Sequence, residues 1–307
     1  MKVVVTGISS YLARAIFPLL EKDEIITEIL GLDLIKPEFS SQKLIFKKRD
    51  VRNKNIDQDL KGYDALIHLA FIVGAKGSKK EIHSINIDGS KNVFNCAIKA
   101  GVKKIIHASS VAAYGSFADN PIPLTEEHPI RLMQKRFYYN ETKYIVERYI
   151  VKLIQENPNV IFTWFRPHIF LGHDMSNDSG RLYGGERIIT IFPDHLIQLA
   201  WFEDIGQAFY LALKKNAPGA FNIAGDNPLT SRELASRLNV KILKIPYELS
   251  LFLIIFSYKL HLQRSLSPGW LRISKNPIIV DSTKAKRILG WKPKYDTFQT
   301  VKEYRKH

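Results

Sequence analysis

The chain has 307 residues, of which 45% are hydrophobic and 24% charged, which is typical of a soluble globular protein with a substantial core. Its single cysteine, Cys96, excludes a disulfide framework and fits a reducing cytosol, so we expect a cytoplasmic protein. The formal charge of +15 is spread along the chain without interleaved aromatic residues, so we expect no nucleic-acid partner.

The N-terminal residues predict a strand, a tight turn and a helix. Residues 2–6 are a β-branched run that begins at once, which leaves no room for a secretory signal. After Gly7, Leu12 and Ile16 recur at helical spacing. The free amides and the dipole of a helix that follows a strand in this way bind anions. We therefore take Gly7, Ser10, Tyr11 and Leu12 as candidates for holding a phosphate group.

A carboxylate follows the next apolar run. Residues 29–32 predict a strand that ends at Asp33, about two dozen residues after the turn. A carboxylate there can accept hydrogen bonds from an adenosine ribose and repels a 2'-phosphate, which favours NAD over NADP.

The chain then continues to alternate between strand and helix patterns. Residues 44–47, 64–70 and 103–108 predict strands, and residues 86–100 predict a helix that Gly101 caps. This order is typical of an α/β protein with a doubly wound parallel sheet. The last of these strands delivers Ser109 and Ser110 to the carboxyl edge, where open sheets of this kind bind ligands.

Tyr139 and Lys143 are spaced for acid/base chemistry. Residues four apart share one face of a helix, so the phenol and the ammonium are expected to point into the same space. A neighbouring ammonium stabilises phenolate and lowers the pKa of a tyrosine. We therefore expect Tyr139 to exchange a proton with an alcohol, Lys143 to tune it, and Ser110 to bind the same substrate oxygen.

Taken together, these features resemble the extended short-chain dehydrogenase/reductases, and within them the NAD-dependent epimerase/dehydratase family, which includes UDP-glucose 4-epimerase. The resemblance covers nearly the whole chain except about 174–192 and 240–275. The residues that carry it, besides the turn, Asp33 and Tyr139/Lys143, are Asp50, His68 to Ala70, Asn86, Ser109 and Ser110, Tyr114 and Gly115, Thr125 to Glu127, Arg166 and Pro167, Trp201 to Ile205, Phe221 to Gly225, Asp281 to Ala285, and Leu289 to Pro293.

The resemblance implies roles for particular residues. It makes Ser110, Tyr139 and Lys143 the catalytic set, with Lys143 also binding a ribose. It implies NAD as cofactor, a Rossmann-type sheet, a smaller and mostly helical C-terminal substrate domain, and a homodimer. The residues that it places against the cofactor are Gly7, Ser10, Tyr11, Leu12, Asp33, Asp50, Val51, Leu69, Ala70, Phe71, Asn86, Ala108, Ser109, Tyr139, Lys143 and Pro167. We expect no metal site, because His68, His107, His168 and His173 lack ligand spacing.

The sequence also departs from the family pattern. Ser10 replaces a glycine, so it would be strained by a positive φ, and its side chain would lie near the pyrophosphate. Val111 and Ala112 stand where dehydratases usually place Asp and Glu, which disfavours dehydration. Ile169 and Leu171 replace polar and aromatic residues of the motif after Arg166 and Pro167, which alters recognition near the nicotinamide.

We expect residues 1–165 to form the NAD-binding domain, receiving parts of 194–225, and residues 166–307 to form the substrate-binding region. There Thr230 and Glu233 predict a helix capping box. The apolar stretch 247–262 is too short to span a membrane. It predicts a helix that packs on the sheet, pairs two subunits, or lines a site for a hydrophobic or lipid-linked substrate. Candidate cations for a diphosphate are Arg181, Arg187, Arg264 and Arg272.

Four functional hypotheses follow. The first is a nucleotide-sugar epimerase that works by transient oxidation of a secondary alcohol. The second is an NAD(P)-dependent dehydrogenase or reductase of a less polar alcohol, similar to the hydroxysteroid dehydrogenases, which Ile169, Leu171 and the 247–262 stretch favour. The third is a non-catalytic NAD-binding protein, and the fourth, a nucleic-acid binder, would show steep salt dependence.

Overall fold

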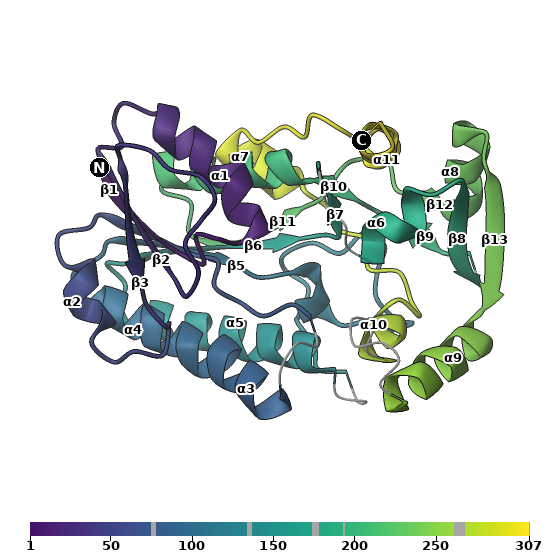
Figure 1. Ribbon diagram of the computed structural model, residues 1–307, viewed down its shortest axis with the longest axis horizontal. Helices are drawn as coiled ribbons and strands as arrows, with labels where there is room; N and C mark the ends of the chain where they lie inside the picture. The colour runs from purple at the N-terminus through teal and green to yellow at the C-terminus, as the bar shows by residue number, and fades with distance from the viewer. Residues whose placement is uncertain (75–77, 134–136, 174–177, 193, 261–267, 307) are drawn as a thin grey trace.

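The computed structural model describes residues 1–74, 78–133, 137–173, 178–192, 194–260 and 268–306. Within these residues, seven parallel strands form one central sheet in the order β3-β2-β1-β4-β5-β6-β11 (Figure 1). Their bounds are Lys2–Thr6 (β1), Glu28–Asp33 (β2), Leu44–Lys48 (β3), Ala65–His68 (β4), Lys104–Ala108 (β5), Ile161–Pro167 (β6) and Gly219–Ile223 (β11). The expected doubly wound α/β fold is confirmed.

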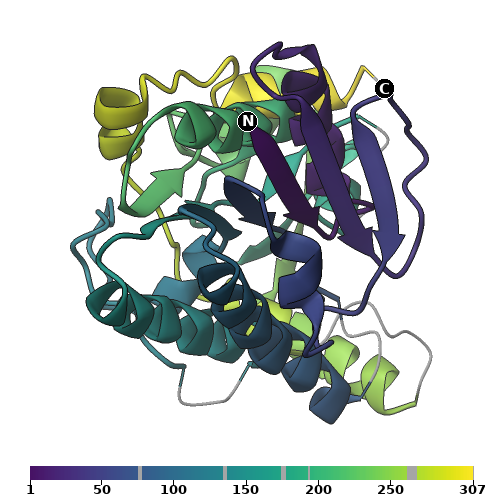
Figure 2. The same ribbon diagram turned by 90° about the vertical axis from the view of Figure 1, so that its left-hand side faces the viewer.

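Helices cover both faces of the sheet (Figure 2). On one face α1 (Tyr11–Lys22) packs against α7 (Phe202–Lys214), and η3 (Ala285–Leu289) joins them. On the other face lie α4 (Ser90–Lys99) and α5 (Tyr138–Glu156), with α2 (Ile56–Leu60), α3 (Lys79–His83) and the π-helical turn η1 (Ser84–Gly89) beside them. Both faces of the sheet are therefore buried, which explains why its central strands are continuous apolar runs.

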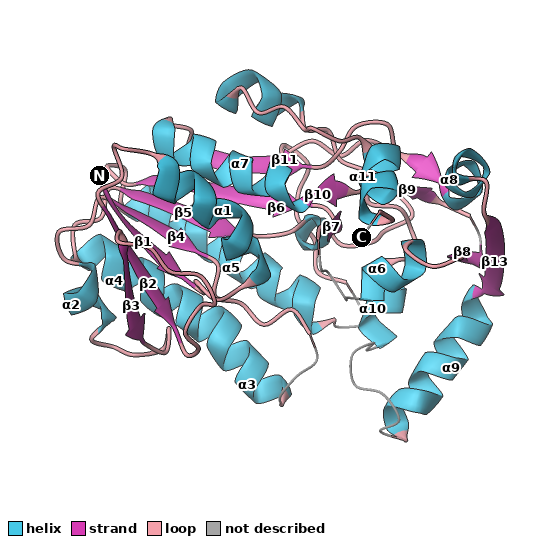
Figure 3. Cartoon of the chain, turned by 45° about the horizontal axis from the view of Figure 1, so that its top comes forward, coloured by secondary structure: helices cyan, strands magenta, loops and turns pink. Residues whose placement is uncertain are grey.

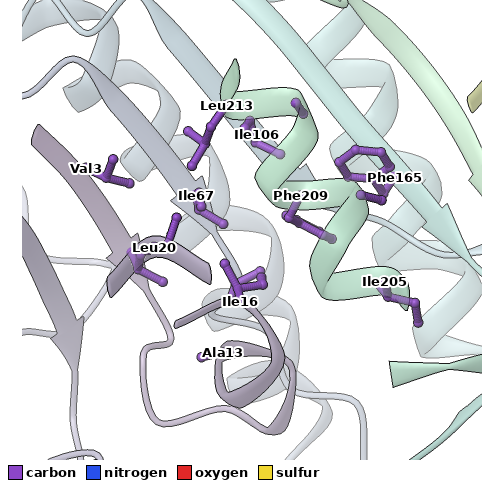
Figure 4. Packing of buried hydrophobic residues seen from close by; sticks show 14 of the residues in the cluster. Val3, Ala13, Ile16, Leu20, Ile67, Ile106, Phe165, Ile205, Phe209 and Leu213 are labelled. Atoms are coloured by element: carbon purple, nitrogen blue, oxygen red, sulfur yellow. The ribbon is translucent and has the colours of Figure 1, made fainter. Parts of the chain in front are cut away.

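The core between the sheet and the α1/α7 layer is close-packed. Figure 4 shows Ile16 and Leu20 of α1 facing the sheet near Ile67, with Phe209 of α7 beside Phe165 of β6. The rings of Phe165 and Phe209 lie 4.7 Å apart, within the range of favourable aromatic pairs. Because α7 and β11 belong to this packing, residues far along the chain complete the N-terminal sheet.

The remaining chain builds a second region at the carboxyl end of the sheet (Figure 3). It pairs short strands in twos: β7 (Phe170–Leu171) with β10 (Ala200–Trp201), β9 (Leu196–Ile197) with β12 (Leu229–Thr230), and β8 (Arg187–Phe192) with β13 (Lys241–Pro246). Its helices are α6 (Asp178–Tyr183), α8 (Ser231–Leu238), α9 (Tyr247–Lys259), α10 (Pro268–Ile273) and α11 (Thr297–Tyr304). The capping box of Thr230 and Glu233 at the start of α8 is confirmed.

The strand order reverses between β1 and β4, because the chain runs outward from β1 to β3 and then returns to the other side of β1. Open sheets bind ligands in the crevice beyond the carboxyl ends of the strands at such a reversal. The candidate residues of the turn after β1, the exit loop of β4 and the serines after β5 all lie at this edge.

Candidate active site

The turn after β1 depends on one glycine. Gly7 has a φ of +73°, and a Cβ atom on it would lie 2.5 Å from the amide nitrogen of Ala70, so no other residue fits without a shift of the backbone. Ser10 differs from our expectation. Its φ is −70°, so it is not strained, and its hydroxyl accepts a hydrogen bond from the amide of Ala13 at 3.3 Å as the N-cap of α1.

Asp33 lies beside this turn at the end of β2. One carboxylate oxygen accepts a hydrogen bond from the amide of Ser9 at 3.0 Å, and the other accepts one from the amide of Leu34 at 2.7 Å. The tertiary structure thus brings Asp33 to the turn that precedes α1. A carboxylate and a helix N-terminus at one crevice fit the ribose and the pyrophosphate of a dinucleotide.

The first turn of α1 also contacts the second region. The hydroxyl of Tyr11 donates a hydrogen bond to the carbonyl of His173 at 2.5 Å, and its ring lies 5.2 Å from that of Phe202. Leu12 is half-buried beside it. The Tyr11 side chain therefore links the two regions, and only its backbone amide remains as a candidate for a phosphate.

Three more of the residues expected against the cofactor, Asp50, Val51 and Asn86, contact other parts of the protein in the structure. Asp50 forms an ion pair with Arg52, with oxygen to nitrogen distances of 2.5 and 2.9 Å, and this pairing lowers the pKa of Asp50. Val51 is buried against Gly89. Asn86 both donates to and accepts from the backbone of Ile72, at 2.9 and 2.8 Å. Asn86 therefore fixes the loop that follows Leu69, Ala70 and Phe71.

The structure brings the three candidate catalytic residues together. Ser110 precedes the 3-10 turn η2 (Val111–Tyr114), and its hydroxyl accepts a hydrogen bond from the amide of Ala112 at 3.1 Å. The side chain of Ser110 lies close enough to the phenol of Tyr139 to oppose the rise of its pKa. The Lys143 ammonium lies 5.6 Å from the centre of the Tyr139 ring and donates a hydrogen bond to the carbonyl of Ala108 at 2.7 Å.

The pKa of Tyr139 is shifted in the opposite direction from the one that its spacing from Lys143 predicts. Burial raises the pKa of Tyr139 to about 12, and the nearby Ser110 side chain lowers it only in part. Burial also lowers the pKa of Lys143 to about 7, against the opposing charge of Glu147. Lys143 therefore does not lower the pKa of Tyr139 in this structure, because desolvation disfavours the charged form of both groups.

A buried ion pair between Glu147 and Arg166, near Lys143, was not predicted from the sequence. Glu147 is only 1% exposed and accepts hydrogen bonds from Ser109 at 2.5 Å, Trp164 at 2.9 Å and Arg166 at 2.5 Å. The hydroxyl of Ser109 thus donates its proton to Glu147, whereas the hydroxyl of Ser110 accepts a hydrogen bond from the backbone. Glu147 lies one further helical turn along the face that carries Tyr139 and Lys143, so continuing the same periodicity would have found it.

Aromatic rings cover the Tyr139 phenol. Trp270 of α10 lies 5.1 Å from the Tyr139 ring and 4.9 Å from Phe137, and the Lys143 ammonium lies 3.3 Å from the centre of the Phe71 ring. A Cβ atom on Gly269 would lie 2.0 Å from Phe137, so this glycine permits the contact between α10 and Phe137. No pattern in the sequence pointed to Trp270, because it lies within residues 240–275, which the family resemblance does not cover.

The remaining candidates lie farther along the same edge. Pro167 ends β6 and pairs with Ile223 of β11. Arg187 is exposed on β8, and Arg272 lies on α10, where its charge acts on Tyr247. Arg264 lies outside the described residues, and the side chain of Arg181 is likewise not described. Ile169 is 45% exposed, whereas Leu171 is fully buried.

The comparisons with known proteins agree with this geometry. The family model described as NAD dependent epimerase/dehydratase family matches residues 3–224. UDP-glucose 4-epimerase of Lactobacillus helveticus is 24% identical over 98% of this chain and 94% of its own length. The mouse decarboxylating sterol-4-alpha-carboxylate 3-dehydrogenase is 26% identical over 76% of this chain and 71% of its own length.

A solved structure shows the same fold. The crystal structure of UDP-glucose 4-epimerase from Thermotoga maritima with UDP-glucose has a TM-score of 0.76 and 21% identity, covering 100% of this chain and 99% of that one. The glycine turn, Asp33 and the helix N-terminus fit the cofactor that the family name gives. The chain therefore belongs to the NAD-dependent epimerase/dehydratase family and is an NAD-dependent enzyme of the extended short-chain dehydrogenase type.

Proposed function

We propose that this protein is a nucleotide-sugar epimerase that oxidises a secondary alcohol transiently and reduces it again from the other face. The proximity of the Ser110 side chain to the phenol of Tyr139, with Lys143 on the same helix face, is the observation that carries this proposal. It places a proton acceptor and a hydroxyl donor where one substrate oxygen can contact both. The absence of an acidic pair at Val111 and Ala112 favours epimerisation over dehydration.

NAD bound along the turn after β1, with Asp33 toward its ribose, would supply a hydride acceptor that also returns the hydride. Residues of the protein bind the substrate and transfer the proton. Ser110 donates a hydrogen bond to the substrate oxygen, and Tyr139 takes the hydroxyl proton and later returns it. Because burial raises the pKa of Tyr139, the mechanism requires that bound cofactor and substrate lower this pKa.

Tyr139→Phe tests this mechanism. The protein would be incubated with a panel of UDP-sugars, and chromatography would follow the appearance of each 4-epimer. Loss of the phenol removes general acid/base catalysis, so turnover should fall by about a hundredfold or more. Tyr144→Phe on the same helix is the matched control, because Tyr144 lies next to Lys143 in sequence and has no part in the proposed chemistry. Full turnover by Tyr139→Phe would eliminate the mechanism, whereas no turnover of any of these sugars by the wild type would support a non-catalytic NAD-binding protein.

A second candidate is an oxidoreductase of a less polar alcohol. The rings of Trp270, Phe137 and Phe71 around Tyr139 favour it, as does the likeness to a sterol dehydrogenase. An epimerase leaves the nicotinamide absorbance of the solution unchanged as substrate is consumed, whereas a net dehydrogenase changes it in proportion. Native mass spectrometry of the purified protein would in addition identify a ligand that copurifies, and would test the predicted homodimer.

A further inference from the structure

Helix α9 carries an exposed apolar stripe. Leu249, Phe252, Leu253, Phe256 and Leu260, at its C-terminal end, each lie three or four residues from another member of the set, and all are about half exposed or more, with Phe252 at 64% and Phe256 at 52%. The rings of Phe252 and Phe256 stack at 6.0 Å. Figure 1 shows α9 at the edge of the molecule farthest from the central sheet. We had expected this helix to be buried or partner-facing, and in the chain alone it is not buried.

The opposite side of α9 is already used. It packs on β8, β13 and α10, and Ser250 on that side is buried. A helix with one face on protein and the other in water normally has a polar outer face, but α9 is apolar all round. A contiguous exposed apolar stripe of this kind marks a site where another protein or a membrane binds.

The charge near α9 indicates whether a second copy of the chain or a membrane covers this stripe. Among the described side chains of residues 241–275, four are basic, Lys241 and Lys244 on β13, Arg272 on α10 and Lys275 over the ring of Tyr247, and one is acidic, Glu248. In a symmetric contact with a second copy, the same basic surface would face itself and repel. An anionic lipid surface complements it instead, and each nearby Lys or Arg strengthens such binding by about 1 kcal/mol.

We propose that α9 docks on an anionic membrane surface, with Phe252 and Phe256 in the boundary between headgroups and acyl chains. A helix lying in the interface plane with an apolar face and basic surroundings binds in this way. In this proposal α9 lies on the bilayer and does not cross it. None of the helices in the described ranges is both long and apolar enough to span a membrane. The proposal does not depend on the substrate, although α9 contacts α10, whose Trp270 covers Tyr139.

Vesicle co-sedimentation of the full chain tests this proposal. The protein should sediment with vesicles of phosphatidylcholine that contain phosphatidylglycerol, less with pure phosphatidylcholine, and less again at high salt. Phe252→Ser/Phe256→Ser should lower the partition coefficient at least about tenfold, because both side chains lose their apolar contact with the lipid. Ile25→Ser/Ile45→Ser is the matched control, since both side chains are exposed on the N-terminal half and should leave binding unchanged.

Two outcomes would overturn the proposal. One is failure of the wild type to bind anionic vesicles, or equal binding by the Phe252→Ser/Phe256→Ser variant. The other is a wild-type dimer in lipid-free solution that this variant converts to a monomer, which would assign the stripe to a second copy. Circular dichroism and the melting temperature should match those of the wild type, because both phenylalanines lie on the outside. Turnover of a water-soluble substrate should also be unchanged, which separates this test from that of the proposed function.

Discussion

The buried ion pair between Glu147 and Arg166 makes Glu147→Gln a strong test of the structure. The two side chains are 1% and 6% exposed, and their closest atoms are 2.5 Å apart. The glutamine keeps the size of the side chain but removes its charge. Arg166 then remains charged and buried, with only uncharged acceptors, the glutamine oxygen and the Tyr114 hydroxyl at 2.7 Å, in place of the carboxylate. Breaking one partner of such a pair costs about 3–5 kcal/mol.

Urea unfolding of the protein without cofactor measures this loss. Glu147→Gln should lower the free energy of unfolding by about 3–5 kcal/mol without a large change in the m-value. Glu147→Gln/Arg166→Met should be less destabilised than the single variant, because no unpaired charge stays buried. The control is Glu156→Gln on the same helix, where the pair with Lys152 is exposed and is worth about 0.5 kcal/mol or less.

A small loss would refute this reasoning. If Glu147→Gln lowered the free energy of unfolding by no more than Glu156→Gln, water would have to reach Arg166 freely. The side chains of Ser109, Trp164 and Arg166 would then not enclose Glu147 as the structure shows.

Two further predictions concern the turn and the pH dependence. Gly7→Ala should lower the free energy of unfolding by at least about 3 kcal/mol and abolish NAD binding, because strain and a clash with Ala70 combine. Gly62→Ala should cost only about 1 kcal/mol, since Gly62 also has a positive φ but an open surrounding; equal losses in urea unfolding would contradict the clash. Burial lowers the pKa of Lys143 to about 7, so between pH 7 and pH 9.5 this residue is protonated more in the unfolded than in the folded protein. The free energy of unfolding of the wild type should therefore rise over this pH range relative to that of Lys143→Met. The rise should be about 1 kcal/mol per pH unit, and parallel curves of melting temperature against pH would exclude the lowered pKa.

Local patterns predicted much of the fold and part of the site. The run before Gly7 and the residues after it predicted a strand, a turn and a helix, and the structure has β1, the turn and α1 there. The predicted C-cap at Gly101 has a φ of +85°. These features depend on residues close together in the chain, so the sequence contains the information that specifies them.

Other properties of the site depend on segments that the sequence could not place. The spacing of Tyr139 and Lys143 predicted their shared helix face but not the direction of their pKa shifts. Trp270 reaches Tyr139 from a region outside the family resemblance. The outward direction of Phe252 and Phe256 likewise followed only from the packing of α9 on β8, β13 and α10.

The sequence by itself determined the order of strands and helices, the glycine turn and the candidates for proton exchange. Each of these follows from periodicity, backbone stereochemistry or side-chain chemistry within a short segment. Only the tertiary structure decided which of these groups are desolvated, which hydroxyls are already bonded to protein, and which apolar side chains face outward. Burial and charge depend on everything that surrounds a residue in space, and most of those neighbours come from distant parts of the chain.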